Sequence, residues 1–330
     1  MNENLPSVTV VIAARPEQAE IKAVTASRLL DYPADKLDIL VARGKQPSAQ
    51  RNQAMKAATG EWIYFLDDDS VPPPDNLRRA ISYLSQPDVK MVGGPNVCPP
   101  DAPGLEQVFG LVLSTWLAFG PSRARYTPVG STRPSNEKEL ILCNLVARRK
   151  EMLALGGFNE ALYPNEENAL MDELQKQGGK LLYDPEFVVH RRPRPNLRSF
   201  MKMLRTYGRG RAEQFRLHPT LGSAPNFVPP LFCLYLVAWV ICGLASLAYP
   251  SLRQWVALAA LPLGLYLLVV LVQVADLARR ASILRSVSTL PLIVLTHILY
   301  GYGFWRGLFT KLKPPEAREP VPVKLERIER

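Results

Sequence analysis

Three consecutive carboxylates follow an apolar, β-rich segment in the first quarter of the chain. Asp67, Asp68 and Asp69 come directly after Trp62–Leu66 and precede a proline-rich turn. Adjacent acids repel one another, and an apolar strand has no packing need for them. Asp67 and Asp69 point the same way in an extended segment, and Mg²⁺ or Mn²⁺ prefers carboxylate and phosphate oxygens. The cluster therefore predicts a divalent metal held against a diphosphate, and an acidic cap for the next helix is the alternative.

The elements that must position these acids alternate between strands and helices. Apolar, β-rich runs are separated by helix-compatible stretches, giving strands at Ser7–Ala13, Leu37–Ala42 and Trp62–Leu66 and helices at Pro16–Leu30 and Ser48–Ala58. Such alternation predicts an α/β fold with a mostly parallel sheet covered by helices on both faces. In these sheets ligands bind at the carboxyl ends of the strands, where the three acids lie.

The last third of the chain has a different composition. Residues Met1 to about Pro225 mix charged, apolar and turn residues, whereas Phe227–Phe309 is mostly apolar. Three runs come near the roughly 20 residues that cross a bilayer as a helix: Val228–Tyr249, Leu252–Ala275 and about Val287–Phe309. We expect two membrane spans and a third that contains His297, Gly301, Gly303 and Arg306, and that could instead be bent or re-entrant. Buried helices of a soluble domain are the alternative.

The charges near these runs indicate an orientation. The first twenty residues give no secretory signal, and a cluster of Arg279, Arg280 and Arg285 between the second and third runs favours the cytosolic side. We therefore expect a multi-pass protein of the cytoplasmic (inner) membrane whose soluble domain faces the cytosol. Three full crossings would put Lys311 and Lys313 outside, against the positive-inside tendency, so full crossing by the third run stays open.

Two sequence blocks resemble family 2 glycosyltransferases. The first is similar to the donor-binding core of that family and comprises Arg51–Ala54, Ala58–Asp69 and Pro74–Leu77. The second is similar to its acceptor and catalytic-base region and comprises Gly156–Glu160, Asn165–Asn168, Leu181–Pro185 and His190. The resemblance extends over roughly residues 7 to 215. It implies a GT-A fold, which is Rossmann-like, and a nucleotide diphosphate sugar as donor.

The resemblance also implies roles for residues at the donor site. Asp67 and Asp69 match the residues that flank the metal and the diphosphate, and Asp68 lies at the donor site. The segment from Ala13 to Glu17 matches the end of the family's first strand, so Ala14 and Glu17 belong to the nucleotide-sugar site, with Glu17 touching the nucleoside. Arg51 and Asn52 match residues near the nucleotide.

The general base of the family falls in the Glu166-Glu167 pair. The family usually has Glu-Asp here, so Glu167 takes the base position with a side chain one methylene longer, and Glu166 is the alternative. A carboxylate in hydrogen-bond reach can remove the proton of a sugar hydroxyl as it attacks the anomeric carbon, and one displacement inverts that carbon. The two acids also suit the start of a helix over Asn168–Lys176.

The loop after the second strand departs from the family. An acidic pair followed by Gly-Ser is common there and contacts the base, but this chain has the basic turn Arg43-Gly44-Lys45. The identity of the nucleotide is therefore open. Arg43 and Lys45 could contact phosphate or could be solvated loop residues.

A basic segment precedes the apolar runs. It contains nine Lys or Arg residues between His190 and Arg216 against the single acid Glu213. The protein as a whole has a net charge of +10, but no nucleic-acid motif is recognisable, so anionic lipid head groups are the simpler partner and we expect no nucleic acid. Within it, Arg205–Arg211 resembles the Tyr-Gly-Arg-Gly-Arg segment of ExoA-type exopolysaccharide glucosyltransferases, and Tyr300–Phe304 is reminiscent of the same group.

Two further binding roles are expected around this segment. Guanidinium groups hold phosphate in a bidentate fork, so Arg205, Arg209 and Arg211 could bind the diphosphate of a polyprenyl-linked acceptor. His190 follows a short apolar strand and could be a further metal ligand, or a hydrogen-bonded structural residue.

These observations give one expected organisation and several alternatives. We expect a GT-A domain over residues 1–195, a basic interfacial segment over 196–226, a small α-helical transmembrane domain over 227–310 and a charged tail over 311–330. The expected activity is inverting transfer of one sugar to a membrane-presented, lipid-linked acceptor in surface polysaccharide or glycoconjugate synthesis. A polyprenyl-phosphate glycosyltransferase and a processive synthase are alternatives, although the Gln-x-x-Arg-Trp motif of processive synthases is absent from the sequence. A membrane scaffold that has lost catalysis is the non-enzyme alternative.

Overall fold

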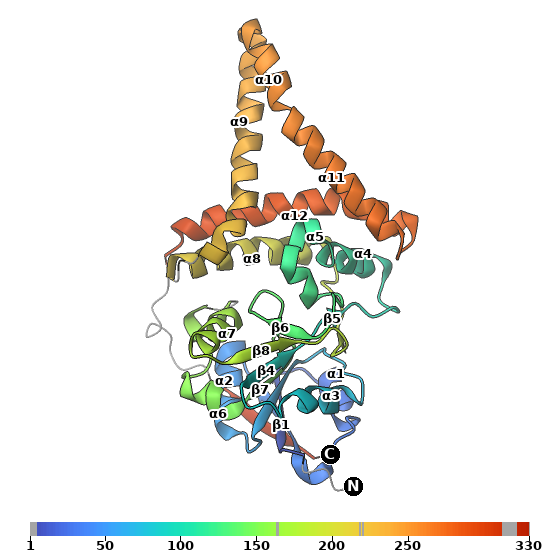
Figure 1. Cartoon of the computed structure of the whole chain (residues 1–330), viewed down its shortest axis with the longest axis vertical. Helices are drawn as coiled ribbons and strands as arrows, with labels where there is room; N and C mark the ends of the chain where they lie inside the picture. The colour runs from blue at the N-terminus through green and yellow to red at the C-terminus, as the bar shows by residue number, and fades with distance from the viewer. Residues whose placement is uncertain (1–4, 163–164, 218, 220, 312–321, 330) are drawn as a thin grey trace. The chain divides into compact units, whose positions relative to one another are not determined.

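The computed structural model describes residues 5–162, 165–217, 219, 221–311 and 322–329 (Figure 1). The chain divides into two compact units. The first unit comprises Met1–Asp101, Pro121–Arg192 and Lys313–Arg330, and the second comprises Ala102–Gly120 and Pro193–Leu312. The division differs from the expected order of domains because an early segment belongs to the second unit and the end of the chain belongs to the first.

An eight-stranded mixed sheet forms the centre of the first unit, in the order β10-β2-β1-β3-β7-β4-β8-β6. Strands β2, β1 and β3 are mutually parallel neighbours, as the alternating pattern predicted, while β7 runs antiparallel to both β3 and β4. The strands are β1 (Val8–Ala14), β2 (Leu37–Arg43), β3 (Trp62–Asp67), β4 (Val89–Gly93), β6 (Arg133–Ser135), β7 (Asn144–Arg148), β8 (Lys180–Tyr183) and β10 (Lys324–Ile328). The α/β fold is confirmed, with a parallel core and antiparallel additions.

The central strands are apolar along their whole length because both faces of the sheet are covered. In β1, Val10 and Ile12 pack into one core cluster, and Val11 packs into the other. This is the pattern expected for parallel strands buried on both sides. The helices of the unit are α1 (Lys22–Arg28), α2 (Pro47–Ala57), α3 (Asn76–Tyr83), α6 (Arg149–Ala154) and α7 (Glu166–Lys176).

A small second sheet brings a distant segment to the end of β3. Strand β5 (Asn96–Val97) pairs in parallel with β9 (Val189–His190), and His190 also forms an isolated antiparallel bridge with Val71. The backbone N–H of Val71 donates to the His190 carbonyl over 2.9 Å, and the His190 N–H returns a bond of 3.0 Å. These two bonds fix the residue after His190 beside the turn that follows β3.

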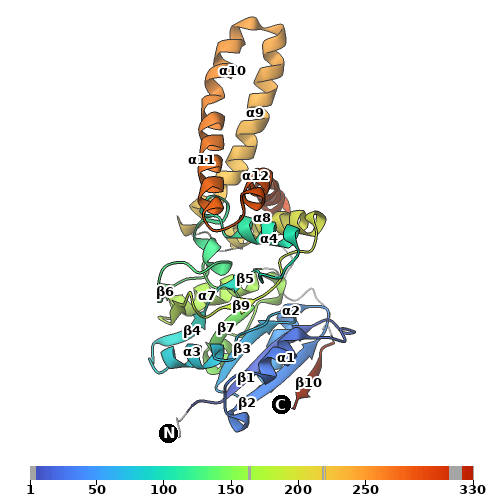
Figure 2. The same ribbon diagram turned by 90° about the vertical axis from the view of Figure 1, so that its right-hand side faces the viewer.

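The end of the chain forms the edge strand of the sheet, where the sequence predicted part of a charged tail. β10 runs antiparallel to β2, with Leu325 opposite Ala42 (Figure 2). Val323 and Leu325 pack on one core cluster and Ile328 packs on the other. An edge strand needs only a few apolar side chains on each face to pack on the core. The segment is therefore too polar to be recognised as a strand from its composition. Residues 312–321 of the predicted tail, including Lys313, lie outside the described residues.

The second unit is helical. Its helices are α4 (Gly104–Leu113), α5 (Trp116–Phe119), α8 (Leu197–Leu217), α9 (Val228–Ala248), α10 (Arg253–Ala259), α11 (Leu261–Ala278) and α12 (Ile283–Phe309). Three helical stretches are long and apolar enough to cross a membrane: Gly222–Ala248, Pro250–Ala278 and Ile283–Phe309. The third is the least apolar and the most buried of the three. Figures 1 and 2 show α8 and α12 lying crosswise to the hairpin of α9 and α10–α11.

Helices α8 and α12 touch through their backbones. A side chain at Gly208 of α8 would collide with the Tyr300 carbonyl, and one at Gly303 of α12 would collide with the Arg205 carbonyl. Glycine at both positions allows this close approach, as small residues do in membrane helix pairs. Gly208 and Gly303, one from each of the two motifs that resemble ExoA-type enzymes, therefore have a packing role in the second unit.

Candidate active site

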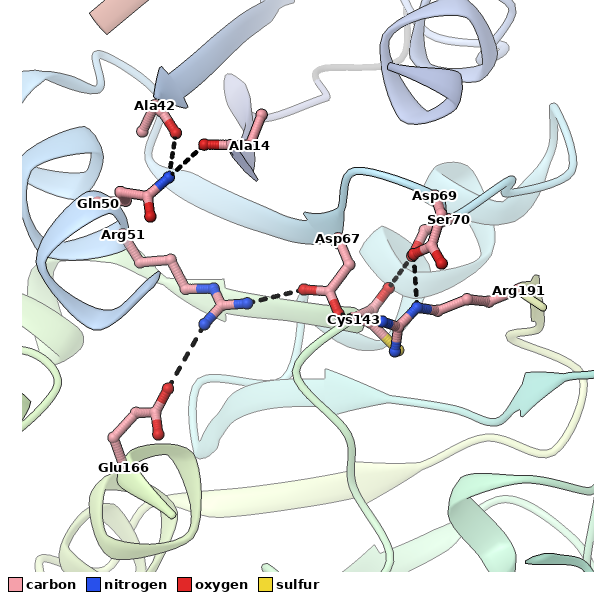
Figure 3. Close-up of polar contacts among 10 residues, drawn as sticks. All are labelled: Ala14, Ala42, Gln50, Arg51, Asp67, Asp69, Ser70, Cys143, Glu166 and Arg191. Carbon is pink, nitrogen blue, oxygen red and sulfur yellow. Dashed lines mark hydrogen bonds and ion pairs between the residues drawn. The ribbon is translucent and has the colours of Figure 1, made fainter. Parts of the chain in front are cut away.

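The acid cluster holds a guanidinium group between two of its members. Asp67 ends β3, and Arg191 follows β9, where the pairing of His190 with Val71 positions it. Arg191 Nε lies 2.6 Å from Asp69 Oδ1, and Arg191 Nη2 lies 3.1 Å from Asp67 Oδ2 (Figure 3). The two carboxylates that the sequence assigned to one cation thus converge on one cationic group.

The pKa shifts in the cluster follow from burial and from the neighbouring charges. Burial alone would lower the pKa of Arg191, but Asp67 and Asp69 raise it well above its ordinary value, so Arg191 stays charged. Burial raises the pKa of the Asp68 carboxyl, and the adjacent Asp69 raises it further. Both effects keep the proton on Asp68 to a higher pH than is usual for an aspartate.

Arg51 connects the acid cluster to the second pair of acids. It lies on α2 and is buried, with 7% of its surface exposed. Its Nη2 lies 2.7 Å from Asp67 Oδ1, and its Nη1 lies 3.5 Å from Glu166 Oε1 (Figure 3). Burial would lower the pKa of Arg51, but Asp67 and Glu166 raise it above its ordinary value. One fixed positive charge thus stands between two sets of carboxylates predicted to have different roles.

Glu166 is the more deeply placed member of the Glu166-Glu167 pair. Both residues lie in the first turn of α7, where Glu166 is buried at 1% exposure and Glu167 is half-buried. Burial, followed by the charge of Glu167, raises the pKa of Glu166 to about 7, against the lowering effect of Arg51. A carboxylate with such a pKa can accept a proton near neutral pH, which is the property required of a general base.

The carboxyl ends of β1 and β2 are held at a fixed separation by one amide. Gln50 on α2 donates from Nε2 to the Ala14 carbonyl over 2.7 Å and to the Ala42 carbonyl over 2.6 Å (Figure 3). Just beyond this tie lies a pocket of about 680 Å³, lined among others by Glu17, Gln18, Arg43, Lys45, Val323 and Glu326. Ala14 therefore contributes a backbone carbonyl to the site, and exposed Glu17 lines the pocket.

Arg43 has neither of the environments that the sequence suggested. Its Nε lies 2.7 Å from Glu326 Oε2 of β10, and its Nη1 donates to the Gln18 carbonyl over 2.7 Å. It is thus neither a solvated loop residue nor a free phosphate ligand. Lys45 lines the same pocket.

Asn52 holds a loop in place. Its side-chain oxygen accepts a hydrogen bond from Phe158 N over 2.8 Å, and its Nδ2 donates to Phe158 O over 2.8 Å and to Glu160 Oε1 over 3.0 Å. Gly157, at φ 78°, packs directly against this amide, and a Cβ there would lie 2.5 Å from Asn52 Oδ1. The Asn52 side chain therefore orders the Gly156–Glu160 segment of the second sequence block.

The residues present fit a divalent cation in part. The pair Asp67 and Asp69 already shares one cation, Arg191, and offers the hard oxygen ligands that Mg²⁺ and Mn²⁺ prefer. Among the described residues no group of three or more His, Cys, Asp or Glu side chains is arranged to hold a metal, so His190 does not join the two aspartates in a preformed cluster. Nδ1 of His190 is buried without a hydrogen-bond partner in the described part of the chain.

The three predicted lipid-phosphate residues lie on α8 in the second unit. Arg205 is exposed and Arg209, one turn later, pairs with Glu213 over 3.4 Å. Arg211 donates to Gln214 over 3.1 Å and, six residues from Arg205, lies on a different side of the helix. The helix thus aligns Arg205 with Arg209 and separates Arg211 from them.

Three residues that matter to this arrangement were not predicted from the sequence. Arg191 was one of nine basic residues counted before the membrane segment, Glu326 lay in the expected charged tail, and Gln50 fell within an expected helix. Only the position of Arg191, directly after the predicted ligand His190, offered a signal.

Comparison with known proteins relates this geometry to a family. The model of the family described as "Glycosyl transferase family 2" matches residues 24–122. The pre-mycofactocin glycosyltransferase of Mycobacterium tuberculosis, in strains CDC 1551 / Oshkosh and ATCC 25618 / H37Rv, is 27% identical over 202 residues, which are 61% of this chain and 41% of that protein. This chain therefore spans about two fifths of the length of the curated relatives it matches.

A solved structure shares the fold over most of both chains. The mannosyltransferase PcManGT from Pyrobaculum calidifontis, solved in complex with GDP-Man and Mn²⁺, superposes with a TM-score of 0.51 at 19% identity. The superposition covers 92% of this chain and 88% of that one. Together with the eight-stranded sheet, it shows that this chain has a GT-A fold, and residues 24–122 within that fold match the model of glycosyl transferase family 2.

Proposed function

We propose that this protein is a metal-dependent, inverting glycosyltransferase that moves a sugar from a nucleotide diphosphate sugar to an acceptor hydroxyl at the membrane. The observation that carries the proposal is the position of Arg51 between Asp67 and Glu166. One side of this buried guanidinium faces the acids that suit a cation and a diphosphate. The other side faces a buried carboxylate that can take up a proton near neutral pH.

On the donor side, Asp67 and Asp69 would hold Mn²⁺ or Mg²⁺. The bound cation would neutralise charge that develops on the nucleoside diphosphate as it leaves. Arg191 pairs with both aspartates, so its guanidinium group and the cation would compete for the same two carboxylates. Arg51 donates to Asp67 and so fixes the orientation of that carboxylate. The charged side chains of this chain thus provide an environment suited to two phosphates.

On the acceptor side, Glu166 or Glu167 would remove the hydroxyl proton. Glu166 has the raised pKa and the fixed position, while half-buried Glu167 occupies the base position by resemblance to the family. Attack by the deprotonated hydroxyl opposite the leaving group inverts the anomeric carbon in one displacement. The two glutamates are one residue apart on α7, so they point in different directions, and separate substitution of each can identify the base.

We infer that the chain crosses the cytoplasmic membrane twice, with the glycosyltransferase domain and the end of the chain on the cytosolic side. Support comes from β10, which follows the apolar helices in sequence yet pairs with β2 of the first unit. Both must therefore lie on the same side of the membrane, which requires an even number of crossings. The hairpin of α9 and α10–α11 supplies two, and the Arg279, Arg280 and Arg285 cluster then lies in the cytosol, as the positive-inside rule favours.

In this topology α12 does not cross the membrane. It is the least apolar and most buried of the three candidates, and it lies crosswise to the hairpin beside the basic helix α8 (Figures 1 and 2). A helix in that position lies along the membrane surface. Exposed Arg205 and neighbouring Arg209 on α8 then face lipid head groups, which suits an acceptor carried on a polyprenyl diphosphate in surface polysaccharide or glycoconjugate synthesis.

Release of nucleoside diphosphate tests the proposed activity. The full chain, purified into lipid nanodiscs with membrane lipid extract, is incubated with GDP-, UDP- and dTDP-sugars and Mn²⁺. We expect release with one donor class, its loss on chelation, and its loss in Asp69→Asn. Asp172→Asn is the matched control, because Asp172 also lies on the first unit but pairs with Lys176 on α7. If no donor gives release of nucleoside diphosphate, the proposed enzymatic activity is wrong, and a membrane scaffold that has lost catalysis is favoured.

A further inference from the structure

The pocket beyond β1 and β2 is built partly from the last residues of the chain. Its walls come from the residues after β1, such as Glu17, from the turn after β2, including Arg43 and Lys45, and from the C-terminal segment, including Val323 and Glu326. The C-terminal segment follows the apolar helices in the sequence, about 280 residues after the turn that it meets. The pocket is therefore complete only when β10 is in place.

The pocket lies next to the acid cluster, as the register of the three parallel strands shows. Ala14 of β1 is in register with Arg43 of β2, and Ala13 is in register with Asp67 of β3. Adjacent strands lie about 4.8 Å apart. The pocket and the acid cluster are therefore neighbours at the carboxyl ends of β2, β1 and β3. A nucleotide with its diphosphate at the cluster would extend its ribose and base toward the pocket.

Glu326 stands in this pocket as a fixed carboxylate. Its Oε2 accepts from Arg43 over 2.7 Å, and its Oε1 lies 2.9 Å from Lys324 Nζ. Arg43 is in turn anchored on the Gln18 carbonyl, whereas Lys324 is 76% exposed and so holds Oε1 only weakly. Each carboxylate oxygen can accept a further hydrogen bond, so Oε1 is available to a ligand that carries hydroxyl or N–H donors.

β10 is also attached independently of the pocket. Arg327 Nη1 lies 2.6 Å from Asp38 Oδ2 of β2, and neither residue lines the pocket. The five paired residues of β10 hold the strand on β2. When the charge of Glu326 is removed, the Arg327–Asp38 ion pair and the pairing with β2 still hold β10 on the sheet.

We propose that β10 completes the nucleoside-binding pocket of the donor site and that Glu326, oriented by Arg43, accepts hydrogen bonds from the ribose hydroxyls or base N–H groups of the nucleotide. This inference rests on the proposed function, because it takes a nucleoside diphosphate as the ligand. The turn after β2 lacks the acids that are common in similar enzymes, and the C-terminal strand supplies a carboxylate to the same place from the other end of the chain.

Binding of nucleotide and of pyrophosphate separates this role from a purely structural one. Isothermal titration of the full chain in nanodiscs, with Mn²⁺, measures the affinity for GDP, UDP and dTDP and for inorganic pyrophosphate. Loss of a charge-assisted hydrogen bond in Glu326→Gln should weaken binding of the preferred nucleoside diphosphate by about tenfold or more, with pyrophosphate affinity unchanged. Arg327→Gln is the matched control, since it removes an ion pair of β10 outside the pocket, and it should leave both affinities unchanged.

Each result decides a different question. If wild-type protein binds a nucleoside diphosphate and Glu326→Gln binds it equally well, β10 only covers the sheet edge, and the proposed function stands. If Arg327→Gln weakens nucleotide binding as much as Glu326→Gln, the effect comes from attachment of the strand, and the role of Glu326 is refuted. If Glu326→Gln weakens binding of pyrophosphate and of nucleotide equally, the lost interaction is not with the nucleoside, and the proposed role of Glu326 is refuted. Failure of wild-type protein to bind any of the three nucleotides overturns the donor assignment and this inference with it.

Discussion

We predict that Arg191 competes with a divalent cation for the same two carboxylates, so that its removal strengthens metal binding. Its guanidinium contacts Asp69 at 2.6 Å and Asp67 at 3.1 Å. The Asp67 and Asp69 side chains are 22% and 40% exposed, so solvent screens both pairs. Each contact then contributes about 0.5–1 kcal/mol, and about 1–2 kcal/mol of interaction must be given up before a metal occupies the position. Arg191→Gln should therefore bind Mn²⁺ about 5- to 30-fold more tightly.

The assay is binding of Mn²⁺ without nucleotide, measured from the electron paramagnetic resonance signal of free Mn²⁺. Thermal unfolding with and without Mn²⁺ gives a second measurement, because metal that binds only the folded state should raise the midpoint more in Arg191→Gln than in wild type. Arg79→Gln is the control, since Arg79 pairs with Asp184 at another place in the first unit. Equal or weaker Mn²⁺ binding by Arg191→Gln, in a protein that still unfolds cooperatively, would refute the competition.

Three further predictions concern the base, the helix pair and the topology. Because the pKa of Glu166 rises from 4.5 to about 7 on folding, the folded protein should lose stability as pH rises between these values, and turnover should fall as pH drops through about 7. Unfolding and rate profiles should both lose this dependence in Glu166→Gln, and a rate profile that changes only in Glu167→Gln would assign the base to Glu167. Gly303→Leu should separate α8 from α12 and lower the midpoint of thermal unfolding in detergent. Gly264→Leu is the control, because an added Cβ there meets no atom within 4 Å, and it should leave the midpoint unchanged. Equal effects of the two substitutions would contradict the packing role. Cysteines placed at Glu20 and Lys324 in a cysteine-free chain should react with an impermeant thiol reagent from the same side of the membrane, and reaction from opposite sides would rule out two crossings.

The part of the candidate site that could be predicted from the sequence depends on local pattern, and the roles of its residues stay predictions. Asp67 and Asp69 were recognisable because an apolar strand places its next residues at the carboxyl edge of a parallel sheet. Glu166 and Glu167 were recognisable as a pair, but burial separates them, and burial depends on which helix face α7 presents to the core. The resemblance to the family favoured Glu167, while the structure gives the raised pKa to Glu166.

The remaining features depend on contacts between distant segments. Arg191 reaches the acid cluster through the pairing of β9 with β5 and Val71, and two-residue strands leave no periodic signal in a sequence. The segment around β10 has the composition of a solvated tail. Of its described side chains, Val323, Leu325 and Ile328 pack on the two core clusters, and so few apolar residues do not mark a strand. In both cases a charged residue that looked like part of a basic or mixed surface is fixed by a partner more than a hundred residues away.

The late position of β10 in the sequence imposes an order on biosynthesis. Glu326 is made 283 residues after Arg43, which at about 5–20 residues per second takes roughly 15–55 s. Throughout that time β2 is an edge strand with open backbone N–H and C=O groups, the kind of edge that can pair with another chain. A ribosome that stops early therefore yields a product with an unprotected sheet and an open pocket wall, whereas a finished chain closes both after its apolar helices have been synthesised.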